Sequence, residues 1–287
     1  MISVIVPTYN SEKTIQRLLD KLINNSVHVK YEIIIVDGCS TDKTVEICKR
    51  YPVIIKNNPK VHAAAARNIG IQSSKGDICA FIDSDCVPCD GWIDLIEKEL
   101  SANDVDAIGG KMIAYPPKND IEDFAGHVFL DTIMKFPDER KVMSGKKVEN
   151  AFITANCAYK KNLLMAIGGF DEFFTNNGED IDLYWRAIEA SPVKLVYVPE
   201  LIVEHSFPDT LKKLRLKYRQ YGIADSKLKS RFSDKKINTD LKFYKLFLIK
   251  LLTLVFHPRI NFYHLVYIWG HIGGKISGSF KYHVINF

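Results

Sequence analysis

The sequence lacks any uninterrupted apolar run of about 20 residues, the length a helix needs to span a bilayer. Its first residues, Met1 to Pro7, also lack the basic start and small-residue cleavage site of a signal peptide. No nucleic-acid-binding module accompanies its basic residues, so nucleic acid is not an expected partner. We therefore expect a protein of the cytoplasm that makes at most peripheral contact with the cytoplasmic face of the cell membrane.

Cysteines are few, and their spacing shows no disulfide framework. Cys86 and Cys89 form a C-x-x-C pair, which is compatible with zinc or redox chemistry. No second pair with the spacing of a metal site follows, so we predict reduced, structural thiols. A Cys86–Cys89 bridge stays open for a hyperthermophilic source.

The first ninety residues alternate between short apolar runs and segments with helical periodicity. Connections between them are short, which favours a parallel sheet covered by helices. With 47% hydrophobic and 25% charged residues, the chain has the composition of a globular protein. The predicted strands are residues 2–6, 32–36, 53–55 and 78–82, and the predicted helices are 15–23, 45–48 and 62–72.

Two carboxylates, Asp83 and Asp85, follow the apolar strand at 78–82. In extended backbone, residues i and i+2 point to the same face, so both side chains can converge on one object. Ligands of open α/β sheets bind beyond the carboxyl ends of the strands. Hard oxygen ligands there suit a divalent cation that carries a diphosphate. The alternative is a polar strand end with solvated acids.

The pattern changes after Trp92, where strands and helices no longer alternate regularly. Residues 118–147 are polar and mixed, and we interpret them as an insertion or mobile loop that is a candidate acceptor lid. A late strand ends at Pro199, and residues 202–205 form a further strand candidate. The other predicted elements are helices at 92–100, 163–167 and 179–190 and an apolar stretch at 106–114.

Six short motifs follow one another between residues 2 and 206: Val4–Asn10, Asp37–Asp42, Ala66–Gly70, Asp83–Asp85, Gly168–Glu172 and Gly178–Asp180. Their order and spacing resemble those of family 2 glycosyltransferases. The resemblance implies an α/β GT-A fold, a mostly parallel sheet flanked by helices, over residues 1–207. It implies inverting transfer of a hexosyl or N-acetylhexosaminyl group from a nucleotide diphosphate sugar, with Mn²⁺ or Mg²⁺ as cofactor.

The resemblance also implies roles for residues in the donor site. Gly38 stands where many relatives have a second aspartate, which weakens any inference about the base. We favour a UDP-sugar and keep a GDP-sugar open. Pro7, Tyr9 and Asp37 would line the base pocket, Arg67 would approach the donor, Asp83 would face the ribose, and Ser84 would bind the donor beside it.

Inverting transfer needs a cation for the leaving diphosphate and a base for the attacking hydroxyl. The resemblance assigns the cation to Asp85 and His205, a pair of donors that favours Mn²⁺ over Ca²⁺. It assigns the base to Asp180, with Glu179 as the fallback. The alternative for both carboxylates is a helix N-terminus stabilised by the dipole, and for His205 a histidine hydrogen-bonded to backbone.

Four further residues have competing interpretations. Arg67 is either a donor contact or a surface arginine, and Asp37 is either a site residue or part of a turn. Asn156 lies where relatives begin their acceptor region, but it also suits a cap or a turn. We interpret Trp185 as core rather than as a platform for a sugar.

The C-terminal region, residues 208–287, differs in composition from the rest. Residues 211–236 are rich in lysine and arginine, and residues 243–269 are apolar and aromatic, interrupted by Lys245 and Lys250. Helices lying in a membrane interface fit this pattern, and the acceptor would then be a lipid-linked saccharide or a polyprenyl phosphate. Packing against the catalytic domain and a homodimer interface remain alternatives.

Two other functions remain to be tested. A nucleotidyltransferase that makes nucleotide sugars should have a Gly-rich phosphate loop after the first strand, and Pro7-Thr8-Tyr9-Asn10 is not one. The other is a scaffold that binds a sugar nucleotide at the membrane without turnover. The carboxylates at 83, 85 and 180 favour an enzyme over that scaffold.

Overall fold

The computed structural model describes residues 1–25, 28–101, 104–134, 137–145, 151–175, 177–190, 192–232 and 241–284. Its contacts divide the chain into two units. The first comprises residues 1–115, 130–175 and 179–206, and the second comprises residues 116–129, 176–178 and 207–287. The segment 116–129 thus groups with the C-terminal helices, whereas the sequence placed it inside a domain of residues 1–207.

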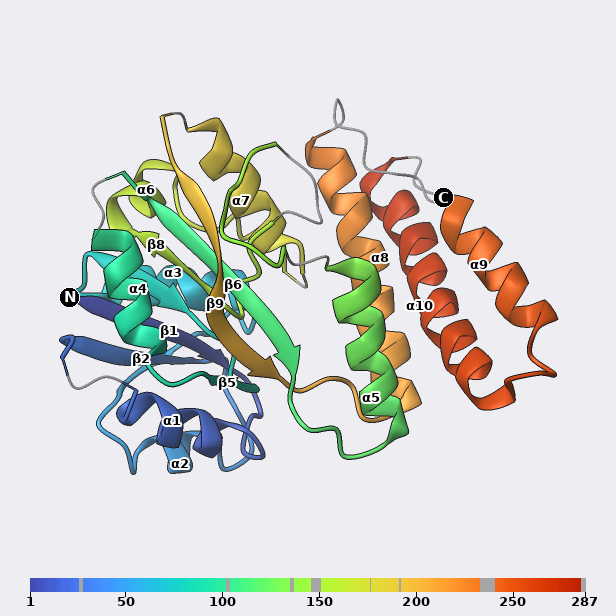
Figure 1. Cartoon of the computed structure of the whole chain (residues 1–287), viewed down its shortest axis with the longest axis horizontal. Coiled ribbons are helices and arrows are strands. Elements are labelled where there is room, and N and C mark those ends of the chain that lie inside the picture. The colour runs from blue at the N-terminus through green and yellow to red at the C-terminus, as the bar shows by residue number, and fades with distance from the viewer. Residues whose placement is uncertain are drawn as a thin grey trace. The chain divides into compact units, whose positions relative to one another are not determined.

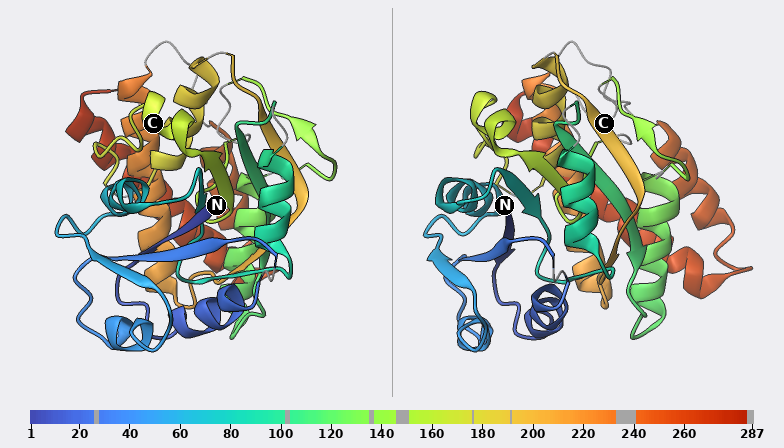
Figure 2. Two further views of the ribbon diagram at one scale, coloured as in Figure 1. Left: turned by 90° about the vertical axis from the view of Figure 1, so that its left-hand side faces the viewer. Right: turned by 60° about the vertical axis from the view of Figure 1, so that its left-hand side comes forward.

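The first unit is built on one mixed sheet with the strand order β3-β2-β1-β4-β8-β6-β9-β5, and β7 pairs with β9. Helices lie on both faces of this sheet, with α3 on one side and α4 on the other (Figures 1 and 2). The strands are β1 Ile2–Thr8, β2 Tyr31–Asp37, β3 Ile54–Asn57, β4 Ile78–Phe81, β5 Cys86–Pro88, β6 Ala107–Ala114, β7 Lys141–Val142, β8 Cys157–Lys160 and β9 Leu195–His205.

The parallel half of the sheet is the part that the sequence predicted. β1 pairs in parallel with β2 and β4, and β2 pairs in parallel with β3. The continuous apolar runs of these strands are typical of parallel strands buried on both faces. Because the strands are parallel, their carboxyl ends meet at one edge, where residues 8–10, 37–40 and 82–85 follow β1, β2 and β4.

Helices cover this half of the sheet through narrow apolar faces. In α1, Ile15, Leu18, Leu19 and Leu22 are fully buried at helical spacing. In α3, a Cβ at Gly70 would lie 2.3 Å from the Ile5 side chain, so only glycine permits this helix to approach β1 so closely. The helices of the unit are α1 Ile15–Ile23, α2 Thr44–Cys48, α3 Ala63–Ser73, α4 Trp92–Ser101, α6 Lys161–Ala166 and α7 Glu179–Glu189.

The second half of the sheet is mostly antiparallel, since β8 pairs in this way with both β4 and β6. The late strand at 194–198 does not end at Pro199. It continues through a bulge opposite Gly110 and Lys111 and forms one long strand, β9, with the predicted strand at 202–205. β6 and β9 pair in parallel on both sides of the bulge.

Residues 118–147 are not simply a loop, so that interpretation was wrong for the helical part. They contain α5 (Asp120–His127) and a π-helical segment, η1 (Val128–Ile133). Asn119 caps α5, because its Oδ1 accepts hydrogen bonds from the backbone N–H groups of Ile121 and Glu122. Residues 135, 136, 146 and 147 lie outside the described residues.

The second unit is helical, with α5, α8 (Leu211–Arg231), α9 (Leu241–Leu252) and α10 (Pro258–Tyr282). α10 lies between α8 and α9 (Figure 1). Cβ atoms at Gly270 and Gly274 would lie 2.5 and 2.1 Å from backbone oxygens of α8, so glycines spaced by four bring these helices into backbone contact. Within the described ranges, no helix is both long and apolar enough to cross a membrane.

Candidate active site

The candidate site lies at the carboxyl edge of the parallel strands, and Asp37 lies near its centre. The Asp37 carboxylate is 6% exposed and accepts hydrogen bonds from Thr8 Oγ1 at 3.2 Å and from Ser40 N and Oγ at 2.9 and 2.6 Å. The Gly38 N–H donates to the Thr8 carbonyl at 2.8 Å. Asp37 therefore joins the ends of β1 and β2. It is part of the turn after β2 and also lies at the candidate site, so the two interpretations from the sequence are compatible.

Tyr9 projects from this edge with 56% of its surface exposed, and Pro7 is half-buried within β1. Tyr9 and Val61 flank Gly38, where an added Cβ would lie 3.3 Å from the Thr8 carbonyl oxygen and 3.6 Å from the Val61 Cα. A larger side chain at position 38 would therefore crowd its neighbours. The structure thus gives a steric reason for glycine at this position.

Arg67 joins two segments that are 112 residues apart in the chain. Its Nη2 donates to Asp83 Oδ1 at 2.8 Å, and its Nη1 donates to Glu179 Oε1 at 2.7 Å. The arginine is only 3% exposed, so the surface-arginine alternative is wrong. Its guanidinium pairs with both carboxylates and therefore links Asp83 to Glu179.

Asp180 follows Glu179 at the start of α7 and differs from it in environment. Glu179 is held by Arg67, whereas Asp180 is half-buried and its carboxylate accepts a hydrogen bond from the Ile181 backbone N–H. Burial, followed by the charge of Glu179, raises the pKa of Asp180 to about 7. The arrangement makes Asp180 the better proton acceptor, because Glu179 is engaged in an ion pair.

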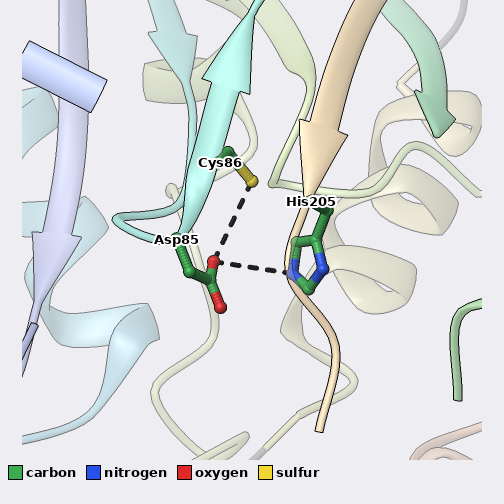
Figure 3. Close-up of side chains that lie close together, drawn as sticks. All are labelled: Asp85, Cys86 and His205. Carbon is green, nitrogen blue, oxygen red and sulfur yellow. Dashed lines mark hydrogen bonds and ion pairs between the residues drawn. The ribbon is translucent and has the colours of Figure 1, made fainter. Parts of the chain in front are cut away.

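Asp85, in the segment between β4 and β5, and His205, the last residue of β9, lie close together. β5 pairs with β9 so that Cys86 lies opposite His205, and His205 Nε2 lies 3.5 Å from Asp85 Oδ1 (Figure 3). The Cys86 thiol lies 3.9 Å from the same oxygen. Burial raises the pKa of Cys86 well above its ordinary value. The ligand atoms of Asp85, Cys86 and His205 all lie within 4.8 Å of one another.

The donor atoms present fit Mn²⁺ or Mg²⁺, although they supply only part of a coordination shell. The Asp85 side chain is 42% exposed, which leaves room for oxygens of a ligand or of water, and the His205 side chain is 15% exposed. Hard oxygen donors suit both ions, and the imidazole favours manganese. All six cysteines are free, so there is no Cys86–Cys89 bridge.

Arg17 belongs to this part of the site, and sequence reasoning missed it. Its Nη2 donates to the Asp85 carbonyl at 2.8 Å and to Ser206 Oγ at 2.5 Å, and its guanidinium lies 4.0 Å from the centre of the Tyr115 ring. It thus ties the segment that carries Asp85 to the segment that carries His205. Nothing in the sequence distinguishes it from other polar residues of α1.

Ser84 and Asn68 hold neighbouring motifs in place. The Ser84 and Ser11 hydroxyls lie 2.8 Å apart, which joins the loop after β4 to the loop after β1. The Asn68 side chain donates to the Phe170 carbonyl at 2.9 Å and accepts from the Phe170 N–H at 2.8 Å. Two of the six sequence motifs therefore meet through Asn68.

Asn156 and Trp185 are structural. The Asn156 amide accepts from Trp92 Nε1 and donates to the carbonyls of Lys111 and Leu201, which satisfies the backbone of the β6–β9 bulge. With every hydrogen-bonding group used and 1% exposure, Asn156 is not available to an acceptor. Trp185 is also 1% exposed, as the core interpretation required.

Residues 3–168, more than half of the chain, match the family described as glycosyl transferase family 2. Glycosyltransferase AglE of Haloferax volcanii is 29% identical over 225 residues, which cover 74% of this chain and 70% of that protein. Pre-mycofactocin glycosyltransferase of Mycobacterium tuberculosis is 27% identical over 239 residues, which cover 82% of this chain and 48% of that protein. The chain spans about half the length of the second relative.

Solved structures resemble the chain over nearly its full length. Mannosyltransferase PcManGT from Pyrobaculum calidifontis, in complex with GDP-Man and Mn²⁺, has a TM-score of 0.62 and 16% identity, covering 96% of this chain and 86% of its own. S. aureus TarS 1–349 has a TM-score of 0.57 and 18% identity, covering 98% and 91%. At such identities the likeness shows the fold alone, and it confirms the predicted GT-A fold.

Proposed function

Because the chain belongs to glycosyl transferase family 2, we propose that it transfers a sugar from a nucleotide diphosphate sugar to an acceptor hydroxyl with inversion at the anomeric carbon. The link through Arg67 carries this proposal. Its ion pairs hold Asp83, the expected ribose contact, and Glu179, the neighbour of the expected base, on one side chain. Donor and base residues from distant parts of the sequence are thereby fixed relative to each other.

Asp180 is the proposed base. An acceptor hydroxyl must lose its proton as it attacks, and a carboxylate is most effective when its pKa lies near the working pH. Burial and the neighbouring charge raise the pKa of Asp180 to about 7, which meets this requirement. Ionised Asp180 would accept the proton on Oδ1 or Oδ2.

Asp85 and His205 would hold Mn²⁺ or Mg²⁺. A bound divalent cation supplies Lewis-acid stabilisation of the negative charge that develops on a leaving diphosphate. The chain's own contribution is to keep the two ligands together through the β5–β9 pairing and through Arg17. Asp83 and Ser84, on the same loop, would contact the donor.

A UDP-sugar is the proposed donor, with a GDP-sugar as the alternative. TarS has been crystallised with UDP and with UDP-GlcNAc, and PcManGT with GDP-Man, so this fold accommodates both kinds of base. In this chain Tyr9, Pro7 and Asp37 would receive the base. Because a Cβ at Gly38 would lie 3.3 Å from the Thr8 carbonyl oxygen, the base would meet backbone groups at this position and not a side chain.

The proposed acceptor is a lipid-linked saccharide or a polyprenyl phosphate at the cytoplasmic face of the cell membrane, and the sugar is a hexose or an N-acetylhexosamine. The support is the composition of residues 208–287, which combine basic and aromatic side chains. Glycan biosynthesis on a lipid carrier would follow from such an acceptor.

The first test is a thermal-shift panel of UDP, GDP, CDP and dTDP, each with and without Mn²⁺. A ligand that binds only the folded state stabilises it by RT ln(1 + [L]/Kd). We expect one nucleotide to raise the melting temperature of the wild type only with metal, and Asp85→Ala to lose the effect. Asp138→Ala, which removes an exposed carboxylate of the same unit, is the matched control. No shift with any nucleotide would overturn the proposed donor site.

The second test separates catalysis from donor binding. Asp180→Asn should retain the metal-dependent nucleotide shift and lose donor turnover, measured as nucleotide release from each candidate donor sugar. Retained turnover in this variant would refute Asp180 as the base, while loss of both readouts would point to a role in donor binding.

A further inference from the structure

The turn between α9 and α10 exposes apolar side chains to an unusual degree. Val255, Phe256 and Leu252 are 86%, 78% and 69% exposed, and Leu248 and Ile260 are more than half exposed. Scattered exposed apolar residues need no explanation, but a contiguous group of this kind indicates an interaction surface. We call residues 248–262 the α9–α10 tip; it comprises the end of α9, the connection seen in Figure 1 and the start of α10.

The α9–α10 tip is an ordered structure. Asn261, which is 2% exposed, donates to the carbonyl oxygen and the hydroxyl of Thr253 at 2.7 and 3.2 Å. Pro258 occupies the first position of α10, where its fixed φ and missing N–H suit a helix start. Hydrogen bonds thus fix the backbone of a turn whose apolar side chains face solvent.

Charge indicates what covers the tip. Every charged side chain between residues 241 and 284 is a lysine or an arginine. Among these, Lys245 is exposed just before the tip and Arg259 is exposed within it, where it pairs with Asp120 of α5. α8, in the same unit, is also strongly basic, with Asp225 as its acid. A surface with an excess of positive charge repels a second copy of itself and attracts an anionic partner.

A second apolar feature continues from the tip along α10. Phe262, Trp269 and Ile276 recur every seven residues, which places them on one face of the helix, and all three are at least 40% exposed. Tryptophan is enriched at the boundary between hydrocarbon and headgroups, because its ring is amphipathic. A stripe of this kind suits a helix that lies in the plane of an interface.

We propose that the α9–α10 tip inserts into the interfacial layer of an anionic lipid bilayer, with the lysines and arginines around it contacting lipid phosphates. Insertion of this kind needs no spanning helix, and none is present in the described part of the chain. The surface is independent of the donor site, and only its value for presenting a lipid-linked acceptor rests on the proposed function.

The experiment is flotation of the full chain with vesicles of phosphatidylcholine, with and without phosphatidylglycerol. We expect the wild type to float with anionic vesicles, and added salt to weaken this binding because it screens surface charge. Failure to float with anionic vesicles at low salt would overturn the proposal.

Substitutions test whether the α9–α10 tip is the surface that binds the vesicles. Val255→Asp/Phe256→Asp changes two exposed side chains, so the fold should be unaffected, and binding should weaken by about tenfold or more. Met165→Asp, at a 60%-exposed residue of α6, is the matched control and should bind as the wild type does. Lys245→Gln/Lys250→Gln should lose the preference for anionic over neutral vesicles.

Two further outcomes would overturn the proposal. One is unchanged flotation of the Val255→Asp/Phe256→Asp variant. The other is a wild-type dimer in light scattering that this variant converts to a monomer, because a second copy would then cover the tip. The nucleotide melting shift, measured on the same samples, distinguishes the two proposals. If flotation is lost and the nucleotide shift is retained, only the tip proposal fails. If flotation is retained and no nucleotide gives a shift, only the proposed donor site fails.

Discussion

Glu179→Gln tests the electrostatics of the site most directly. Two effects raise the pKa of Asp180, burial first and the charge of Glu179 second, while Arg67 opposes them. The substitution removes the second effect and leaves Arg67 ion-paired to Asp83. Less of the Arg67 charge is then neutralised, which also lowers the pKa of Asp180. Both consequences act in the same direction.

The expected size follows from these causes. The pKa of Asp180 is raised from 3.8 to about 7, with burial as the largest contribution. Removing the smaller contribution should lower the pKa to a value between 3.8 and about 7, because burial remains, and each pH unit of this change is equivalent to about 1.4 kcal/mol. A base must be ionised to act, so activity falls as the pH drops through this pKa. The acid limb of the profile should therefore move to lower pH.

The assay is the pH dependence of kcat/KM for donor turnover, which reports the pKa values of the free enzyme. Glu189→Gln is the matched control, since Glu189 lies on the same helix at its other end, about 15 Å away at 1.5 Å per residue. Its profile should match that of the wild type. An acid limb that stays in place in Glu179→Gln, or that moves to higher pH, would refute the assignment of Asp180 as the base.

Three further outcomes are expected. Arg17→Met should weaken the metal-dependent nucleotide shift without abolishing folding, because it frees the segments of Asp85 and His205; an unchanged shift would contradict a positioning role. Gly110→Ala should lower the free energy of unfolding in urea by about 1–3 kcal/mol, since its Cβ would lie 2.1 Å from the Leu201 carbonyl oxygen. Asp180→Asn should stabilise the protein more at pH 8 than at pH 4. Below 3.8 Asp180 is protonated in both states, but as the pH rises from 3.8 to about 7 only the unfolded state ionises readily, so the wild type loses stability, and this loss is complete above about pH 7. Melting temperatures at the two pH values check this.

The parallel half of the fold was predictable because its signals are local. Strands buried on both faces are continuous apolar runs, and the helices between them have clear apolar periodicity, as in α1. The antiparallel half was not, since β5 and β7 have only three and two residues and β9 continues past a proline. Its continuity depends on Asn156, which donates hydrogen bonds to two carbonyls of a bulge that no local sequence pattern predicts.

The candidate site also has residues that local sequence patterns suggested and contacts that they could not show. Motifs selected the carboxylates Asp37, Asp83, Asp85 and Asp180 as candidates, because their positions after strands or at a helix start can be read from the sequence. The sequence could not show that Arg67 is buried between Asp83 and Glu179, since this contact joins residues far apart in the chain. It also gave no reason to select Arg17, whose partners are a backbone carbonyl, a serine and a ring.

Backbone strain in the first unit marks the same edge of the sheet. Asn10, Cys39 and Val61 have φ values of 48°, 62° and 56°, and they follow β1, β2 and β3 respectively. Left-handed backbone is tolerable for asparagine but unfavourable for a β-branched valine. Such strain persists only where surrounding contacts enforce it, and it is concentrated at ligand sites.

The contacts of Asn10 show how this strain is enforced. The Asn10 N–H donates to Ser40 Oγ, and its Oδ1 accepts from the Thr41 N–H, each at 2.8 Å. The loops after β1 and β2 therefore hold each other in shape, which preforms the surface where the donor base would bind and reduces the ordering that binding would require.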